Sequence, residues 1–168
     1  MNHDEESASP DVEARLARVA ENEQALLATL HIILDATYLT VGPGEIPEYE
    51  HIAERERYAE TAVFWYWWTA NLIFNATSYE LKEDYANMLA NNLALYVPGM
   101  AEIITDRWVE YEHDDSETDR IAKAELAFRR TLAHIDPRVP VPEVVGGDFV
   151  AEAVRSITEL FRQHTTWT

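Results

Sequence analysis

Cysteine is absent from the 168 residues of this sequence, which excludes disulfide bonds, thiolate zinc sites and thiol catalysis. Basic residues are scarce: 13 Lys and Arg stand against 31 Asp and Glu, and only Lys82 and Lys123 are lysines. Direct binding to nucleic acid is therefore disfavoured, because phosphate contacts depend on basic side chains. Glycine occurs five times, and neither "GPG" nor "GG" has the flanking pattern of a phosphate-binding loop.

The opening residues also lack the features of a secretion signal. "MNHDEESASP" is polar and acidic, with neither a basic nor an apolar segment, so we expect no secretion by a signal peptide. The longest apolar run, "AVFWYWWTANLIF", covers only residues 62–74. A membrane-spanning helix needs about twenty predominantly apolar residues, so we expect no membrane span.

Acid is what the sequence has in excess, with a formal net charge of −18. Three interpretations are open: an ordinary acidic protein, a mimic of nucleic acid, or adaptation to molar salt. Molar salt shortens the Debye length to about 3 Å and so screens the repulsion between crowded carboxylates. The acid-rich, lysine-poor composition resembles that of haloarchaeal proteins and of proteins from their viruses. That resemblance implies a location in a virion or in the cytoplasm of a high-salt organism.

Apolar residues recur at helical spacing along nearly the whole chain, which predicts an all-α fold of about six helices in one helical-bundle-like domain. The first helix is expected to be long, from Asp11 to about Thr40. Later helices are predicted to begin near Pro47, at a Thr77–Glu80 capping box, at Met100, after a Ser116 cap and at Asp148. The predicted organisation is a polar leader (1–10), a helical domain (11–136), a Pro-rich extended arm (137–147) and a C-terminal helix and tail (148–168).

A heptad-like apolar stripe runs along the first predicted helix. Its members are spaced by threes and fours, with Glu23 filling the one missing position: Val12, Leu16, Val19, Leu26, Leu30 and Ile33. The stripe fits either a helix that packs on its own domain or a coiled-coil seam with another subunit.

The aromatic run at 62–74 is apolar on every side, which predicts a central helix buried by several neighbours. We expect Phe64 and Trp67 in the core of the domain. Trp65 and Trp68 lie on a more mixed face, and we expect them nearer the edge, against a neighbouring subunit or the first helix. Val139 and Val141 in the Pro-rich arm and Trp167 in the tail are further candidate interface residues.

Two short motifs raise the question of catalysis. Glu48–His51 and Glu110–His113 share the Glu-x-x-His spacing, and two such pairs together with two lone Glu build the di-iron site of the ferritin-like bundles that this pattern resembles. In an up-down bundle these two pairs would fall at opposite ends. Arg129 and His134, in "RRTLAH", resemble the Arg-x4–6-His motif of HEPN-domain ribonucleases, which implies metal-independent RNA cleavage.

The sequence as a whole favours a structural or assembly protein without a cofactor, which acts through contacts with copies of itself and with other protein subunits. A small all-α protein with an extended arm resembles the head–tail connector rings of tailed viruses, here a virus of a salt-loving archaeon. That resemblance implies a homo-oligomer. The alternatives are the HEPN-like ribonuclease with Arg129 and His134, and the di-metal bundle with Glu48, His51, Glu110 and His113.

Overall fold

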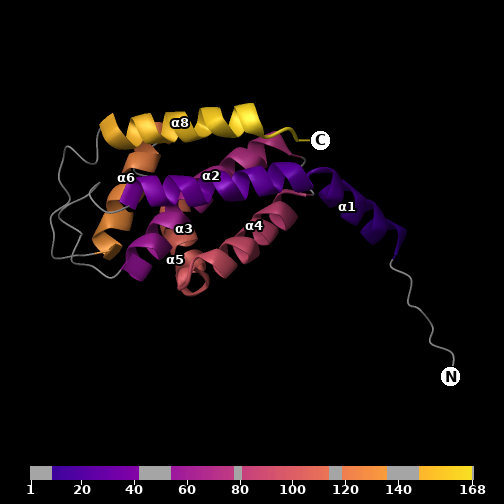
Figure 1. Ribbon diagram of the computed structural model, residues 1–168, viewed down its shortest axis with the longest axis horizontal. Helices are drawn as coiled ribbons and strands as arrows, with labels where there is room; N and C mark the ends of the chain where they lie inside the picture. The colour runs from indigo at the N-terminus through magenta and orange to yellow at the C-terminus, as the bar shows by residue number, and fades with distance from the viewer. Residues whose placement is uncertain (1–8, 42–53, 78–80, 114–118, 136–147, 168) are drawn as a thin grey trace, which may run out of the picture.

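The computed structural model describes residues 9–41, 54–77, 81–113, 119–135 and 148–167, and every regular element within them is an α-helix (Figure 1). The described residues form seven helices: α1 (Pro10–Glu21), α2 (Glu23–Val41), α3 (Glu54–Ala76), α4 (Lys82–Tyr96), α5 (Met100–Glu112), α6 (Arg120–Ile135) and α8 (Asp148–His164). The predicted all-α class and single bundle-like domain are confirmed. None of the described helices has both the length and the apolar character that crossing a bilayer requires.

Helix α3 is the centre of the bundle. It packs against α2, α4, α5, α6 and α8, and every residue from Thr61 to Ala70 is buried. Phe64 and Trp67 lie in the core, as predicted. A helix that is apolar all round is stable in water only when neighbours cover each side, which is the arrangement found here.

The three tryptophans of the aromatic run each reach a different neighbouring helix. The indole N–H of Trp65 donates to Thr40 Oγ1 on α2 at 3.1 Å, and that of Trp68 donates to Thr158 Oγ1 on α8 at 3.1 Å. Trp67 donates to Glu112 Oε1 on α5 at 2.7 Å. Because a buried indole N–H needs an acceptor, these bonds satisfy the one polar group of each ring and fix how the helices sit around α3.

The first predicted helix is in fact two helices, divided at Asn22. The Asn22 side chain is buried, and its amide donates to the Arg18 carbonyl at 3.3 Å and to the Tyr85 hydroxyl at 2.5 Å. The Tyr85 hydroxyl in turn donates to the Arg18 carbonyl at 3.2 Å. These bonds from Asn22 and from Tyr85 on α4 satisfy the Arg18 carbonyl near the end of α1. The chain turns at this point, and α1 extends away from the bundle (Figure 1).

Two predicted helix starts also need correction. The Thr77 hydroxyl donates back to the Ile73 carbonyl at the end of α3, and α4 begins only at Lys82. Helix α6 is capped by Asp119, whose carboxylate accepts from the Ala122 N–H at 2.9 Å, while the predicted cap Ser116 lies outside the described residues. The predicted break at Pro98–Gly99 is confirmed, since Gly99 adopts a φ of +87°.

The C-terminal helix belongs to the same packed body. Helix α8 lies against α2 and α6, and α2 lies between α8 and α4 (Figure 1). Beyond α8, the Trp167 ring packs against Tyr85 on α4 and Phe161 on α8, with centroid distances of 5.6 and 5.9 Å. The tail therefore lies beside the Asn22 turn from which α1 projects.

Candidate functional site

Exposed apolar side chains are concentrated on three helices. Among the described residues, ten large apolar side chains are exposed, and eight of them lie on α1, α2 and α4. These eight are Val12, Leu16, Leu27, Tyr38, Leu39, Met88, Leu95 and Tyr96. Leu95, at 80%, is the most exposed of them. Exposed apolar side chains that gather over neighbouring helices mark an interaction surface.

Helices α2 and α4 run alongside each other in the same direction, with one groove between them and a second groove where their far ends meet α3. The groove nearer the Asn22 turn holds 160 Å³, and Leu27 and Met88 are among its lining residues. The groove at the far end holds 460 Å³, with Tyr38 and Tyr96 in its lining. We call these four residues, together with the exposed Leu39 and Leu95 that adjoin Tyr38 and Tyr96 in the sequence, the α2–α4 face.

This face is poor in acids although the protein is rich in them. Helix α2 carries only Glu23 and Asp35, and α4 has no charged residue from Tyr85 to Tyr96. Copies of a chain with a net charge of −18 repel each other wherever carboxylates meet. The α2–α4 face is a part of the surface where two copies can approach with few carboxylates between them, namely Glu23 at one groove and Asp35 farther along α2.

The predicted heptad stripe is divided by the turn at Asn22. Its second half, Leu26, Leu30 and Ile33, is buried in the core of the chain itself and is not an interface with another subunit. Its first half is on α1, which has no buried residue: Leu16 is 61% exposed, Val12 is 45% exposed, and Val19 is half-buried. The side chain of Arg15 pairs with Asp84 at the start of α4, which helps to hold α1 in place.

The other predicted interface residues fall in different surroundings. Trp65 and Trp68 do not meet a neighbouring subunit: both are buried, because α2 and α8 cover the face that had been expected at the edge. The contact of Trp65 is with the first predicted helix, the other partner foreseen for it. Trp167 is half-buried on Tyr85 and Phe161. Val139 and Val141 lie outside the described residues.

A charged cluster joins α3, α5 and α6. Nε and Nη2 of Arg107 donate to Oε2 and Oε1 of Glu60 at 2.9 and 2.8 Å, and this hydrogen bonding raises the pKa of Arg107 against the opposing effect of burial. Glu110 accepts from Arg130 at 3.2 Å and pairs with His134 Nε2 at 2.7 Å. Burial raises the pKa of Glu110, but the bonds from His134 and Arg130 outweigh it and leave that pKa below its usual value.

The structure does not bring the two predicted ribonuclease residues together. Arg129 is exposed, and residues five apart on a helix point about 140° away from each other. His134 instead shares Glu110 with Arg130 and borders a hollow of 260 Å³ that Glu56 and Glu60 also line. Arg55 lines the same hollow and Glu60 is already paired with Arg107, so the hollow is of mixed charge. RNA cleavage by Arg129 and His134 stays a prediction.

The predicted metal ligands are likewise not assembled within the described residues. Glu110 is occupied by Arg130 and His134, and His113 is exposed at the end of α5. Glu48 and His51 lie outside the described residues. Across the part of the chain that the structure describes, no three His, Asp or Glu side chains are grouped closely enough to hold a metal ion.

Sequence reasoning missed the α2–α4 face. A usable signal was present in "YANMLANNLALY" at 85–96, which is uncharged for twelve residues in a chain where 26% of residues are charged.

Comparison of the chain with protein-family models, with curated proteins and with solved structures finds no match.

Proposed function

We propose that this protein is a structural subunit that assembles with other copies of itself through α1 and the α2–α4 face. The observation that carries the proposal is the coincidence, on α4, of exposed apolar side chains with the uncharged residues 85–96. Apolar area drives association, and the scarcity of carboxylates there lowers the repulsion that opposes association elsewhere on the chain.

Helix α1 supplies the second part of the argument. It is amphipathic, with Val12 and Leu16 four residues apart on one side and Asp11, Glu13 and Arg18 elsewhere on the helix. An amphipathic helix gains most of its stability by burying its apolar side, and the bundle of α1's own chain leaves Val12 and Leu16 exposed. A second copy of the chain can cover that side while α1 covers part of the second copy.

The experiment is a mass measurement in molar salt by sedimentation equilibrium. We expect the parent protein at a multiple of its 19.3 kDa chain mass. We expect Leu16→Glu and Leu95→Glu to shift the mass to that of the single chain while circular dichroism shows unchanged helix content. Interface anchors of this kind typically contribute about 2 kcal/mol or more, equivalent to roughly thirtyfold in affinity.

Leu160→Glu is the matched control, because Leu160 is an exposed apolar residue on α8, outside the α2–α4 face and α1. It should leave the mass of the assembly unchanged. A parent protein that stays at the single-chain mass over the whole concentration range contradicts the proposal. Equal dissociation by Leu160→Glu would mean that the surface involved has been wrongly located.

The acid excess supports a further element of the proposal, adaptation to high salt. At low salt the carboxylates repel over a longer distance, so both folding and association should weaken. Circular dichroism from molar to millimolar salt should show loss of helix on dilution. A chain that is equally helical at both salt concentrations contradicts adaptation to high salt, but it does not contradict the assembly proposal.

The narrower hypothesis is that the assembled form is the head–tail connector ring of a virus of a salt-loving archaeon. It depends on the architectural resemblance of a small all-α chain with a Pro-rich segment at 137–147. Electron microscopy of the assembled protein distinguishes it, since a connector gives closed rings and a simple dimer does not.

A further inference from the structure

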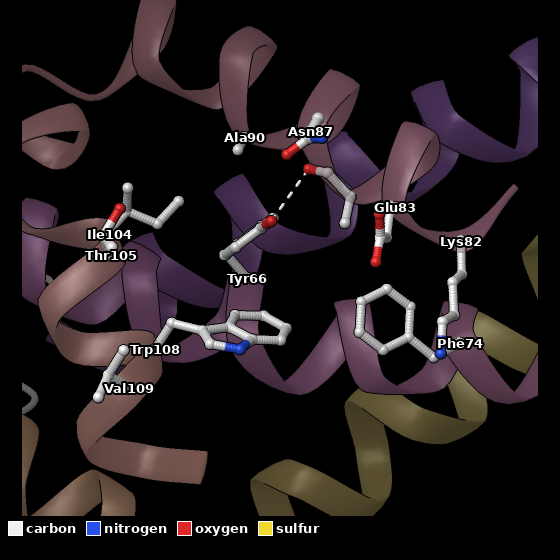
Figure 2. A pocket seen from close by; sticks show the side chains of 11 residues that line it. Tyr66, Phe74, Lys82, Glu83, Asn87, Ala90, Ile104, Thr105, Trp108 and Val109 are labelled. Atoms are coloured by element: carbon white, nitrogen blue, oxygen red, sulfur yellow. Dashed lines mark hydrogen bonds between the residues drawn. The ribbon is translucent and has the colours of Figure 1, made fainter. Parts of the chain in front are cut away.

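An open pocket of about 500 Å³ lies between α3, α4 and α5, away from the α2–α4 face (Figure 2). Its volume is in the range of small-molecule sites, about 300–1,000 Å³. Three aromatic side chains, Tyr66, Phe74 and Trp108, form much of its lining, and Ala86 and Ala90 leave room opposite them. Small residues facing large rings produce the hollow.

The three rings form one continuous aromatic wall. The Trp108 centroid lies 5.7 Å from that of Tyr66 and 5.9 Å from that of Phe74, with interplanar angles of 53° and 59°. The Tyr66 hydroxyl donates to the Ala86 carbonyl at 3.0 Å, which fixes that ring. Tilted rings of this kind present both edges and faces to the pocket, and a ring face carries the negative part of the aromatic quadrupole.

Trp108 differs from the other four tryptophans in the bonding of its indole N–H. Those of Trp65, Trp67, Trp68 and Trp167 each donate to a side chain. The Trp108 indole donates to no group within the described residues, and its ring lines the pocket. A hydrogen-bond donor is therefore available beside the aromatic wall for an oxygen from outside the chain.

Charge at one end of the pocket indicates which kind of ligand the wall suits. The ammonium group of Lys82 lies over the Phe74 ring, 5.4 Å from its centroid, so this ring face already holds a cation. Figure 2 shows the Glu83 carboxylate pointing toward the part of the pocket that Phe74 lines. Aromatic faces together with a carboxylate are the groups that recognise organic ammonium ions.

We propose that this pocket binds a compact organic ammonium ion that also carries an oxygen, with its cationic head on the Phe74 and Trp108 rings beside Glu83. Lys82 is then an internal competitor, because its ammonium lies over the same Phe74 ring. Anionic ligands are disfavoured by Glu83 and by the net charge of −18. This proposal does not depend on the assembly proposed above.

The test is isothermal titration calorimetry at constant ionic strength with choline and with 3,3-dimethyl-1-butanol, which has the same shape and hydroxyl but no charge. We expect choline to bind and the neutral analogue to bind at least about tenfold more weakly. Phe74→Leu keeps the apolar bulk and removes the ring, and should weaken choline binding by about five- to tenfold. Glu83→Gln should weaken it by about three- to fivefold.

Lys82→Met should strengthen choline binding by at least about threefold, because it removes the competing ammonium from the Phe74 ring. The matched control is Lys123→Met, which removes the other lysine and the same charge from α6, outside the pocket, and should leave the affinity unchanged. Glu152→Gln, on the surface of α8, is the corresponding control for Glu83→Gln.

Three results would overturn the proposal. Equal binding of the neutral analogue would show a pocket that recognises shape and apolar surface alone. Equal affinities in the parent, Phe74→Leu and Lys82→Met would show diffuse attraction of cations to an acidic surface. The absence of measurable binding by both the parent and Lys82→Met, with circular dichroism showing both folded, would show that the pocket does not bind such ions.

Discussion

Helices α3 and α1 differ sharply in how much of their surface the rest of the chain covers. In α3, each residue from Thr61 to Ala70 is buried, and three indoles bond to α2, α5 and α8. In α1 no residue is buried, and Val12 and Leu16 are exposed. A helix that is apolar on all sides is stable only at the centre of a bundle. A helix with a single apolar stripe, such as α1, can lie at the surface and bury that stripe against another chain.

The two helices also differ in the number of contacts that hold each of them to the rest of the chain. Five other helices surround α3, but α1 is attached through the Arg15–Asp84 pair, the half-buried Val19 and the Asn22 turn beneath Tyr85. Loss of one contact should therefore have different results in the two regions. In α3 it should destabilise the whole fold, and in α1 it should change only that helix and what binds to it.

The largest effect is expected from Trp65→Ala on α3. The substitution leaves a cavity in the core and removes the indole that bonds to Thr40, and such truncations cost about 3–5 kcal/mol of unfolding free energy. Urea denaturation followed by circular dichroism measures the loss. Trp65→Phe is the control that keeps most of the bulk and should cost less. A loss below about 1 kcal/mol for Trp65→Ala contradicts the central role of α3.

An intermediate effect is expected at the turn that joins the two regions. Asn22→Ala removes the buried amide that bonds to Arg18 and Tyr85, which should cost about 1–3 kcal/mol. Amide hydrogen exchange should quicken in α1 before it does in α3. Tyr85→Phe, which keeps the ring and removes only the hydroxyl, should give a smaller change of the same kind. Uniform quickening over both helices would mean that α1 is not a separate unit.

A smaller effect is expected from acid, through Glu110 on α5. Its pKa is lowered in the folded chain, so its contribution to stability is present above the ordinary value of 4.5 and is lost as the pH falls below that value. Glu110→Gln should flatten the pH dependence of stability in that window. Glu102→Gln, an exposed residue on the same helix, should not. Parallel curves for the parent and Glu110→Gln would contradict this account of the α5–α6 contact.

The smallest effect on the fold is expected from Leu16→Ala. Leu16 is largely exposed, so truncation should change the unfolding free energy of the single chain by no more than about 0.5 kcal/mol. Urea denaturation at a protein concentration too low for assembly measures it. The same variant should weaken assembly at high concentration. A large loss of stability in the dilute sample would show that Leu16 packs on its own chain.

How far sequence reasoning reached can be seen at particular residues. The all-α class and the Pro98–Gly99 break were predicted, because helical periodicity and glycine conformation are local properties. The break at Asn22 was missed, since a partner 63 residues away, Tyr85, creates it. Among the candidate site residues, exposure of Val12 and Leu16 fits the interface prediction, whereas burial of Trp65 and Trp68 does not.

The sequence by itself determined that the chain is helical, that it buries the aromatic run in its centre, and that it carries an acidic surface. Spacing of apolar residues and turn chemistry are sufficient for these, because they act within a few residues. Only the tertiary structure decided which helix covers which tryptophan, where α1 leaves the bundle, and that the uncharged residues 85–96 of α4 lie beside α2 to form an apolar face. Those features depend on which helices pack together. Such packing joins residues that are far apart in the sequence, so no single stretch of sequence determines it.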